Sequence, residues 1–316
     1  MIQRILVPLD GSCLAETALA HAAALAASLG TELLLLRVVE AHSVPDPMAS
    51  GIDWRLRRAE AEAYLGGVAN RLRAAGVEAA TAVVAGKAAD KIVGFARARG
   101  ADLVILSAHG RGEASRFPLG GTVQKVLSNA PFSVMVVRPA EGGAAPAIGL
   151  RYRRIVVPVN GSAASEWALC LAASIARQHD AELLMLQIAP EAPPAWERVP
   201  RSAEETELVE RLQGFQRQRV EKYLHELAFQ LADSGIQVRG RVAPAPQVAR
   251  GIQEAALEEG ADLLVLSAHA AGGAAFPHGG VAEHLLAQSA IPVLVLQDLP
   301  GEGWEEGPRA AVSSHR

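Results

Sequence analysis

Short, continuously apolar runs alternate with longer, alanine-rich stretches along the chain. Runs with little polar alternation are typical of strands covered on both faces, and the stretches between them have helical spacing. This alternation predicts βαβ units and a parallel sheet. In the first half the predicted strands are 5–9, 33–39, 79–85, 103–107 and 134–137, and the predicted helices are about 14–29, 54–75, 88–99 and 122–128.

The pattern occurs twice. Residues 4–12 read RILVPLDGS and residues 154–162 read RIVVPVNGS, while ADLVILSAHG at 101–110 returns as ADLLVLSAHA at 261–270. The offset between the copies grows from 150 at the first strand to 160 at the fourth, which predicts a longer second helix in the second copy, about 203–233. A whole domain has therefore been duplicated, and each copy serves as a control for the other.

The duplication predicts two domains, 1–138 and 151–297, joined by a Gly/Ala/Pro-rich linker at 139–150 and followed by a disordered tail at 298–316. Each domain is long enough to bury its own core. The predicted fold is α/β: two tandem three-layer α/β/α domains, each with a five-stranded parallel, doubly wound sheet. Ligands bind such sheets at the carboxyl ends of the strands where the strand order reverses, so the loops after strands one and four form the candidate site.

Asp10, Gly11 and Ser12 follow the first strand and precede a helix. Gly11 permits a tight turn, and Ser12 is a good N-cap residue. We expect Asp10 to lie at the mouth of the crevice, where its carboxylate can accept hydrogen bonds from a ribose or a base. The alternative is an Asx-type turn in which Asp10 only stabilises its own loop.

The loop after strand four reads SAHGRG at 107–112, and GGT at 120–122 opens the next helix. Glycines let backbone N–H groups approach a ligand, and a helix start presents unpaired N–H donors, so together they indicate an anion site. Thr122 can add a hydroxyl and Arg111 a charge-assisted contact to a phosphate. His109, equivalent to His269, is interpreted as a turn-stabilising side chain rather than a general base. The alternative is a flexible loop with a glycine-tolerant helix start.

Composition excludes several classes of function. The net charge of −4 and the absence of a Lys/Arg cluster argue against nucleic acid, and no apolar stretch approaches the ~20 residues that span a bilayer. Asp10 interrupts the first apolar run, so no signal peptide is predicted, and two sparse thiols, Cys13 and Cys170, favour a reducing cytoplasm. The sequence lacks a Walker loop, metal-ligand spacing and a Gly-x-Ser-x-Gly elbow, so neither a metal site nor nucleophilic catalysis is predicted.

These motifs resemble the universal stress protein family in its tandem, two-domain form, over residues 1–138 and 151–297. The resemblance rests on ILVPLDGS at 5–12, the motif at 101–110, and LGGT at 119–122 followed by Ala130-Pro131 and a last strand. It implies a fold like that of the adenine nucleotide α-hydrolases. It also implies that the first domain binds ATP, with Mg²⁺ as a possible companion, or a related adenine nucleotide, in a protein that senses or regulates the response to stress.

ATP-binding members of the family carry Gly, two residues, Gly, nine residues, then Gly followed by Ser or Thr. Here the spacing is kept, but Ser107 replaces the first glycine and Gly121 the hydroxyl residue, with Thr122 one position later. Asp10 matches the family's acidic residue, and Val38 matches the valine whose backbone meets adenine. The implied nucleotide-binding residues are Asp10, Val38, Ser107, His109, Gly110, Arg111, Gly120, Gly121 and Thr122.

The second copy departs further from this pattern. Asn160 stands for the acid and Ala270 for the second glycine, and only eight residues, 271–278, precede Gly279 and Gly280. If the glycine equivalent to Ala270 has a positive φ, a Cβ there blocks the close approach of phosphates. We therefore expect an asymmetric pair in which the first half binds nucleotide and the second is chiefly a packing partner.

Two alternatives of other classes stay open. One is a slow ATP hydrolase, or a transferase on the same fold, with Asp10 and His109 as the residues to suspect and Mg²⁺ bridging the phosphates. The other is an interaction module whose two sites are both vestigial. The duplication also suggests that the two halves form an intramolecular pseudo-dimer, and it leaves open a homodimer of chains.

Overall fold

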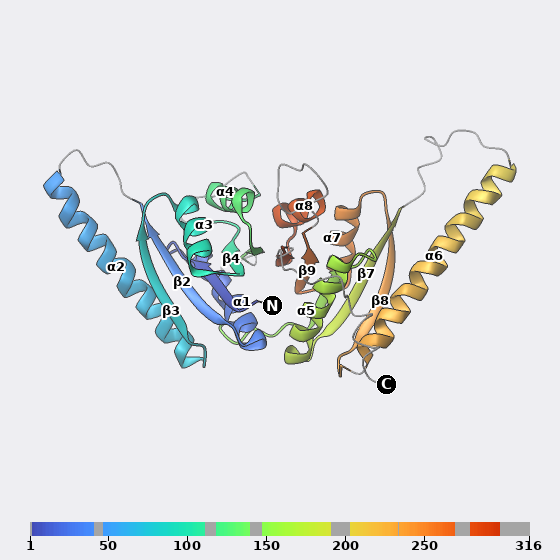
Figure 1. Ribbon diagram of the computed structural model, residues 1–316, viewed down its shortest axis with the longest axis horizontal. Helices are drawn as coiled ribbons and strands as arrows, with labels where there is room; N and C mark the ends of the chain where they lie inside the picture. The colour runs from blue at the N-terminus through green and yellow to red at the C-terminus, as the bar shows by residue number, and fades with distance from the viewer. Residues whose placement is uncertain are drawn as a thin grey trace. The chain divides into compact units, whose positions relative to one another are not determined.

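The computed structural model describes residues 2–40, 47–110, 118–139, 147–190, 203–232, 234–268 and 279–297 (Figure 1). Most of the predicted linker and the whole predicted tail lie outside these ranges. The chain divides into two compact units, and each is considered by itself. Unit 1 is Met1–Arg151 together with Ala268–Leu299, and unit 2 contains Tyr152–Ser267.

Unit 1 contains the predicted doubly wound sheet. Its five parallel strands lie in the order β3-β2-β1-β4-β5, so the chain adds strands on one side of β1 and then returns to add β4 and β5 on the other. The order therefore reverses between β1 and β4, where Ile5 lies opposite Leu103. The strands are β1 (Arg4–Pro8), β2 (Glu32–Val39), β3 (Ala79–Ala85), β4 (Leu103–Ser107) and β5 (Ser133–Val137).

Four helices of the first copy cover this sheet: α1 (Cys13–Leu29), α2 (Pro47–Ala74), α3 (Ala88–Arg99) and α4 (Gly121–Asn129). α2 runs along β3 and β2, and α3 lies on the other side of these strands and packs against α4 (Figure 1). α2 begins at Pro47 rather than near residue 54. Residues 47–53 lack a clear apolar stripe, but proline at the first helical position fits the helix because its φ is already suitable and no N–H is lost.

The second copy contributes one strand and one helix to unit 1. β10 (Val293–Leu296) lies antiparallel to β5, with Leu294 opposite Met135. All residues of both strands are buried. β5 is thereby protected from being an exposed, apolar sheet edge, which would otherwise be open to unwanted pairing.

Arg138, directly after β5, binds the C-terminal end of the contributed helix α8 (Gly280–Gln288). Its guanidinium donates to the carbonyl oxygens of Leu286 at 3.1 Å and Ser289 at 2.6 Å, and also to that of Ala287. A cation at a helix C-terminus satisfies carbonyls that have no intrahelical partner. The contact therefore joins the end of the first copy to the last helix of the second.

Unit 2 repeats the winding of unit 1. Its parallel strands lie in the order β9-β6-β7-β8, with the reversal between β6 and β9. Its elements are β6 (Arg154–Pro158), α5 (Ala163–His179), β7 (Glu182–Pro190), α6 (Ala203–Ala232), β8 (Val238–Ala245), α7 (Val248–Glu258) and β9 (Leu263–Ser267). Within the part of the chain that the structure describes, no helix combines the length and apolarity needed to cross a membrane.

The first helix of each copy begins alike and ends differently. Ser12 and Ser162 cap α1 and α5 with their side-chain oxygens, at the amides of Ala15 and Ser165. α1 ends at Gly30 in the left-handed conformation, φ 64°, which is common for a glycine at a helix C-terminus. α5 ends instead at Asp180, which has φ 55° and is the single non-glycine residue with positive φ among the described residues.

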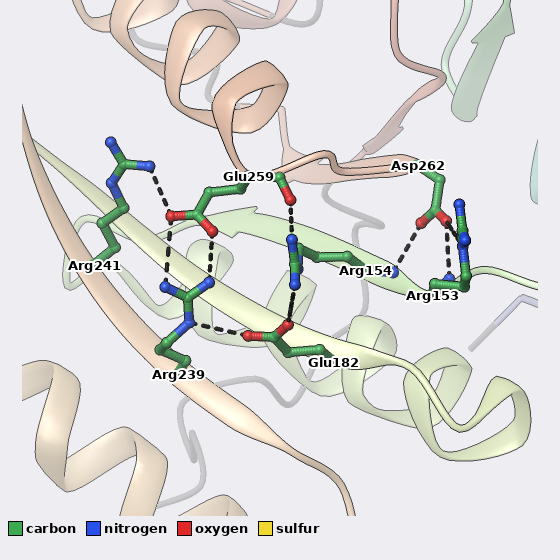
Figure 2. Close-up of polar contacts among 7 residues, drawn as sticks. All are labelled: Arg153, Arg154, Glu182, Arg239, Arg241, Glu259 and Asp262. Carbon is green, nitrogen blue, oxygen red and sulfur yellow. Dashed lines mark hydrogen bonds and ion pairs between the residues drawn. The ribbon is translucent and has the colours of Figure 1, made fainter.

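The amino ends of the strands of unit 2 carry an ion-pair network (Figure 2). Glu182 accepts hydrogen bonds from Arg154 at 2.8 Å and Arg239 at 3.0 Å. Arg239 also pairs with Glu259 at 2.5 Å, and Glu259 pairs with Arg241 at 2.7 Å. The strand register places alanines, Ala80 and Ala82, at the positions of Arg239 and Arg241 in the first copy, so the outer part of this network belongs to unit 2.

The arginines keep both glutamates ionised. Burial raises the pKa of Glu182, but the hydrogen bonds from Arg239 and Arg154 outweigh burial, so its pKa lies below the ordinary 4.5. Hydrogen bonding to Arg239 is the main cause of the lowered pKa of Glu259. A carboxyl whose pKa is lowered by folding stabilises the fold above its unfolded pKa, and that contribution is lost as the pH falls through the folded value.

Arg239→Ala is expected to lower the free energy of unfolding of unit 2 by about 1 kcal/mol at about pH 7, because two partly exposed ion pairs are lost. The deficit should shrink as the pH falls below about 4.5, because the contribution of the ion pairs is lost as the glutamates of the wild type become protonated at their lowered pKa values. Urea denaturation with hydrogen exchange of the β6–β8 amides measures it. Arg250→Ala, which breaks an exposed i,i+4 pair on α7, is the control and should change less. An equal deficit at about pH 7 and about pH 3 would contradict this account.

Asp180→Gly is expected to stabilise unit 2 by about 0.5–1 kcal/mol, because glycine adopts the left-handed conformation without the steric cost of a Cβ. Gly30→Ala, the reverse change at the equivalent helix end, should destabilise unit 1. Urea unfolding of both variants checks the pair. A fall in stability for Asp180→Gly would show that the aspartate side chain contributes more than its backbone costs.

Candidate functional site

A cavity of about 200 Å³ lies at the strand-order reversal of unit 1, at the carboxyl ends of β1 and β4. Loops from both strands line it together with the start of α4, as the winding rule predicts. Eight of the nine residues predicted from the sequence line this cavity: Asp10, Val38, Ser107, His109, Gly110, Gly120, Gly121 and Thr122. The ninth, Arg111, lies outside the described residues.

Apart from Val38, the apolar part of the cavity was not predicted. Leu36 of β2 and Ala88 and Ile92 of α3 join Val38 in lining it. α3 begins at the same edge of the sheet, and the Ala88 amide donates to Glu40 Oε1 at 3.3 Å. The i,i+4 spacing of Ala88 and Ile92 directly after β3 was the available signal, because it puts both on one face of the first turn of α3.

Asp10 makes the Asx-type turn that the sequence left as an alternative. Its Oδ1 accepts hydrogen bonds from the Ser12 amide at 2.8 Å and the Ser12 hydroxyl at 2.5 Å, across Gly11 with φ 76°. Ser12 Oγ in turn accepts from the Ala15 amide at 3.1 Å. Asp10 therefore stabilises its own loop and also lines the cavity.

The second copy shows that this turn does not require a charge. Asn160 Oδ1 accepts from the Ser162 amide at 3.1 Å and hydroxyl at 2.7 Å, and Gly161 has φ 79°. An amide oxygen thus replaces the carboxylate oxygen with the same partners. The negative charge of Asp10 is an additional property of the first copy, available to the cavity.

Gly110 approaches the carboxylate of Asp10 closely. A Cβ built on Gly110 would overlap Asp10 Oδ2 and lie 3.3 Å from Cγ. Gly110 is not among the glycines of positive φ. The expectation that Ala270 blocks the second site assumed a positive φ at the equivalent glycine, and that assumption is wrong for the first copy. Ala270 and residues 271–278 lie outside the described residues, and the blocked second site stays a prediction.

The start of α4 leaves backbone donors for a ligand. Its N-cap residue, Gly120, has no side chain to cap the helix, and the Gly120 amide donates to Ala108 O at 2.9 Å. The next amides, of Gly121, Thr122 and Val123, belong to the first turn and have no acceptor within the helix. Such a turn favours an anion by its open N–H groups and by the helix dipole. In unit 1 the equivalent start of α8 has a different geometry, with Gly279 at φ 77° against −65° for Gly120.

Ser107, which stands where the family pattern has glycine, is accommodated against α1. It is buried, and its Oγ lies 3.5 Å from Thr17 Oγ1. Thr17 also donates to Leu14 O at 2.6 Å. The extra hydroxyl therefore has a polar neighbour in the core while Ser107 contributes to the cavity wall.

A polar chain supports the Asp10 turn from the sheet side. Arg37 donates to Leu9 O at 3.3 Å and lies over the Tyr64 ring, 5.8 Å from its centre. The Tyr64 hydroxyl donates to Glu16 Oε1 at 2.9 Å, and burial followed by Glu16 raises the Tyr64 pKa. This chain fixes the residue before Asp10. The second copy keeps the Tyr223–Glu166 bond at 3.2 Å.

The residue at the position of Arg37 differs between the two copies. The strand register puts Gln187 there in unit 2, and its Oε1 is a buried oxygen without a hydrogen-bond partner. The supporting cation and the acidic residue that follows β1 therefore occur together in the first copy. Across the described residues, no group of three or more His, Cys, Asp and Glu side chains is arranged to hold a metal ion.

Comparison with known proteins agrees with the resemblance found in the motifs. The model of the universal stress protein family matches residues 1–138 and again 151–297. The chain belongs to the universal stress protein family. Two matching regions make it a tandem form.

Individual members of the family match about one copy or the whole chain. A universal stress protein of Methanocaldococcus jannaschii is 29% identical over 142 residues, 44% of this chain and 83% of that protein. One from Thermus aquaticus is 33% identical over 144 residues, 44% of this chain and 100% of that protein. The crystal structure of a universal stress protein from Archaeoglobus fulgidus matches 93% of this chain and 98% of its own, with a TM-score of 0.65 at 18% identity. A Pseudomonas aeruginosa protein of unknown function matches 94% and 92%, with a TM-score of 0.64 at 20% identity. These structural matches support the tandem α/β fold.

Asp10→Asn is expected to leave the stability of the ligand-free protein nearly unchanged, because the Asx turn forms equally around Asn160. Asp10→Ala removes both acceptor bonds and should lower the free energy of unfolding of unit 1 by about 1–2 kcal/mol. Thermal and urea unfolding without ligand compare the three proteins. Equal destabilisation by both substitutions would show that the loop needs the charge itself.

Proposed function

We propose that this universal stress protein binds an adenine nucleotide, ATP in the first instance, in the cavity of unit 1 and regulates a stress response according to its occupancy. The observation that carries the proposal is the meeting of an anionic carboxylate, Asp10, with the uncapped start of α4 in one cavity with an apolar wall. A carboxylate suits ribose hydroxyls, and open amides suit phosphates. An apolar wall suits a purine.

The residues fit such a ligand in three parts. Leu36, Val38 and Ile92 provide the apolar wall for the base, and Asp10 accepts hydrogen bonds from the ribose. The loop at 107–110 and the amides of Gly121 and Thr122 receive the phosphates. At about 200 Å³ the cavity is smaller than the ~300–1,000 Å³ of typical ligand sites, so the nucleotide extends beyond it. Mg²⁺ would be bound through phosphate oxygens, the type of ligand that it prefers.

Binding alone can operate a regulator. A ligand that binds only the folded state stabilises it by RT ln(1 + [L]/Kd), roughly 2.7 kcal/mol at a hundredfold excess over Kd. We propose that this free energy orders the loops around the cavity and changes affinity for a partner. We also propose that the protein acts in the cytoplasm and that its two copies form a pseudo-dimer. The pairing of β10, from the second copy, with β5 supports the pseudo-dimer.

We further propose that one nucleotide binds per chain. The second copy lacks the carboxylate at Asn160, and its last helix begins at a glycine of opposite φ to Gly120. Both differences affect groups assigned to ribose and phosphate in the first copy.

Isothermal titration with ATP is expected to give one site per chain. Asp10→Asn should weaken binding about tenfold or more while the fold persists, because a charge-assisted hydrogen bond contributes about 1.5–3 kcal/mol. Asn160→Asp, the matched control, should leave both affinity and stoichiometry unchanged. Two equivalent sites, or unaltered binding by Asp10→Asn, would refute the proposal.

Phosphate release separates binding from the alternative of a slow hydrolase. A binding protein gives tight ATP association with no turnover. Turnover in the wild type that disappears in Asp10→Ala would instead establish the hydrolase.

A further inference from the structure

The close approach of Gly110 to Asp10 joins two loops that are a hundred residues apart. Asp10 follows β1 and Gly110 follows β4, the two strands on either side of the reversal. A Cβ on Gly110 would come well within 3.0 Å of Asp10 Oδ2, closer than real Cβ atoms approach other atoms. The carboxylate therefore occupies the space that a side chain at position 110 would need.

Asp10 cannot easily give way. Its Oδ1 is held by the Ser12 amide at 2.8 Å and hydroxyl at 2.5 Å, and Ser12 caps α1. A rotation that moves Oδ2 away from Gly110 also moves Oδ1 and breaks these bonds. The aspartate has only two side-chain torsions, so both oxygens are fixed by the turn.

Gly121, which also lines the cavity, differs from Gly110 in its surroundings. A Cβ on Gly121, at the start of α4, meets no atom within 4 Å. Backbone conformation gives no reason for glycine at 110 either, because its φ is not positive. The requirement at position 110 is therefore steric, and the atom that imposes it is an oxygen of Asp10.

The duplication changes both positions together. The first copy has Asp10 with Gly110, and the second has Asn160 with Ala270. The Asx turn around Asn160 is kept, and asparagine has the shape of aspartate, so the second copy differs at this position in charge and not in size.

We propose that Gly110 is a positioning residue that leaves room for the Asp10 carboxylate at the mouth of the cavity. The main role of Gly110 is then to let the Asp10 carboxylate take its position as a hydrogen-bond acceptor, rather than to let a phosphate approach. The part that concerns ligand affinity rests on the proposed nucleotide function. The steric part concerns the ligand-free protein and stands independently.

A double-mutant cycle tests the pair with Gly110→Ala, Asp10→Ala and the double variant. Each is compared with the wild type in thermal unfolding without ligand and in titration with ATP. In the presence of Asp10, Gly110→Ala should lower the unfolding temperature by at least about 3 °C. It should also weaken ATP binding about as much as Asp10→Ala does.

When Asp10 is already alanine, the added methyl meets no carboxylate. Adding Gly110→Ala to Asp10→Ala should then change the affinity for ATP less than about twofold. The double variant should unfold at a temperature no lower than that of Asp10→Ala. Gly94→Ala is the matched control, since it adds a methyl to an exposed position of α3 where nothing lies within 4 Å. This variant should leave the affinity for ATP unchanged and should not lower the unfolding temperature.

Equal losses of affinity from Gly110→Ala in both backgrounds would overturn the proposal, because the glycine would then act on the phosphates directly. An unchanged unfolding temperature for Gly110→Ala in the presence of Asp10 would overturn it as well. If the wild type binds no ATP, the proposed function fails, while the unfolding half of the cycle still decides the steric pair.

Discussion

The hydrogen bonds that hold Asp10 to Ser12 are the constraint on which the site of this protein depends. These hydrogen bonds close the turn that follows β1, and Ser12 in turn caps α1. The second carboxylate oxygen of Asp10 then points toward the loop that follows β4. The turn lies at the reversal of strand order, where neighbouring loops must diverge and leave a cavity. A local device of three residues thus places a charge where the topology of the whole sheet provides space.

The duplicated chain separates what the fold needs from what the site needs. Both copies keep the glycine of positive φ, the capping serine and the acceptor oxygen, because the turn from strand to helix requires all three. The charge at Asp10 and the supporting Arg37 occur only in the first copy, and neither is needed for the second to fold. In unit 2 the added charges lie at the opposite ends of the strands, where Arg239 and Glu259 join β8 to the end of α7.

Much of this arrangement could be predicted from the sequence, and each exception has a physical cause. The strands and the two loops of the cavity follow from apolar runs, glycines and the winding rule, all of which act within a few residues or through chain order. β10 beside β5 could not be predicted, because an antiparallel partner for β5 depends on which buried edge is available in three dimensions. The start of α2 at Pro47 was not predicted because residues 47–53 lack a clear apolar stripe, and the proline at the first helical position was the available signal.

Gly110 illustrates the same limit at the scale of one atom. The motif indicates that glycine matters there, and a positive φ is the usual reason, yet the backbone of Gly110 is ordinary and the reason is a side chain from another loop. A sequence pattern records that a position is restricted without recording by what. When the restricting group is itself a candidate ligand contact, the two positions act as one unit, and a substitution at either one changes where the carboxylate can lie. Asn160 keeps the shape of aspartate and the oxygen that closes its turn, so at this position the second copy differs from the first in charge and not in size.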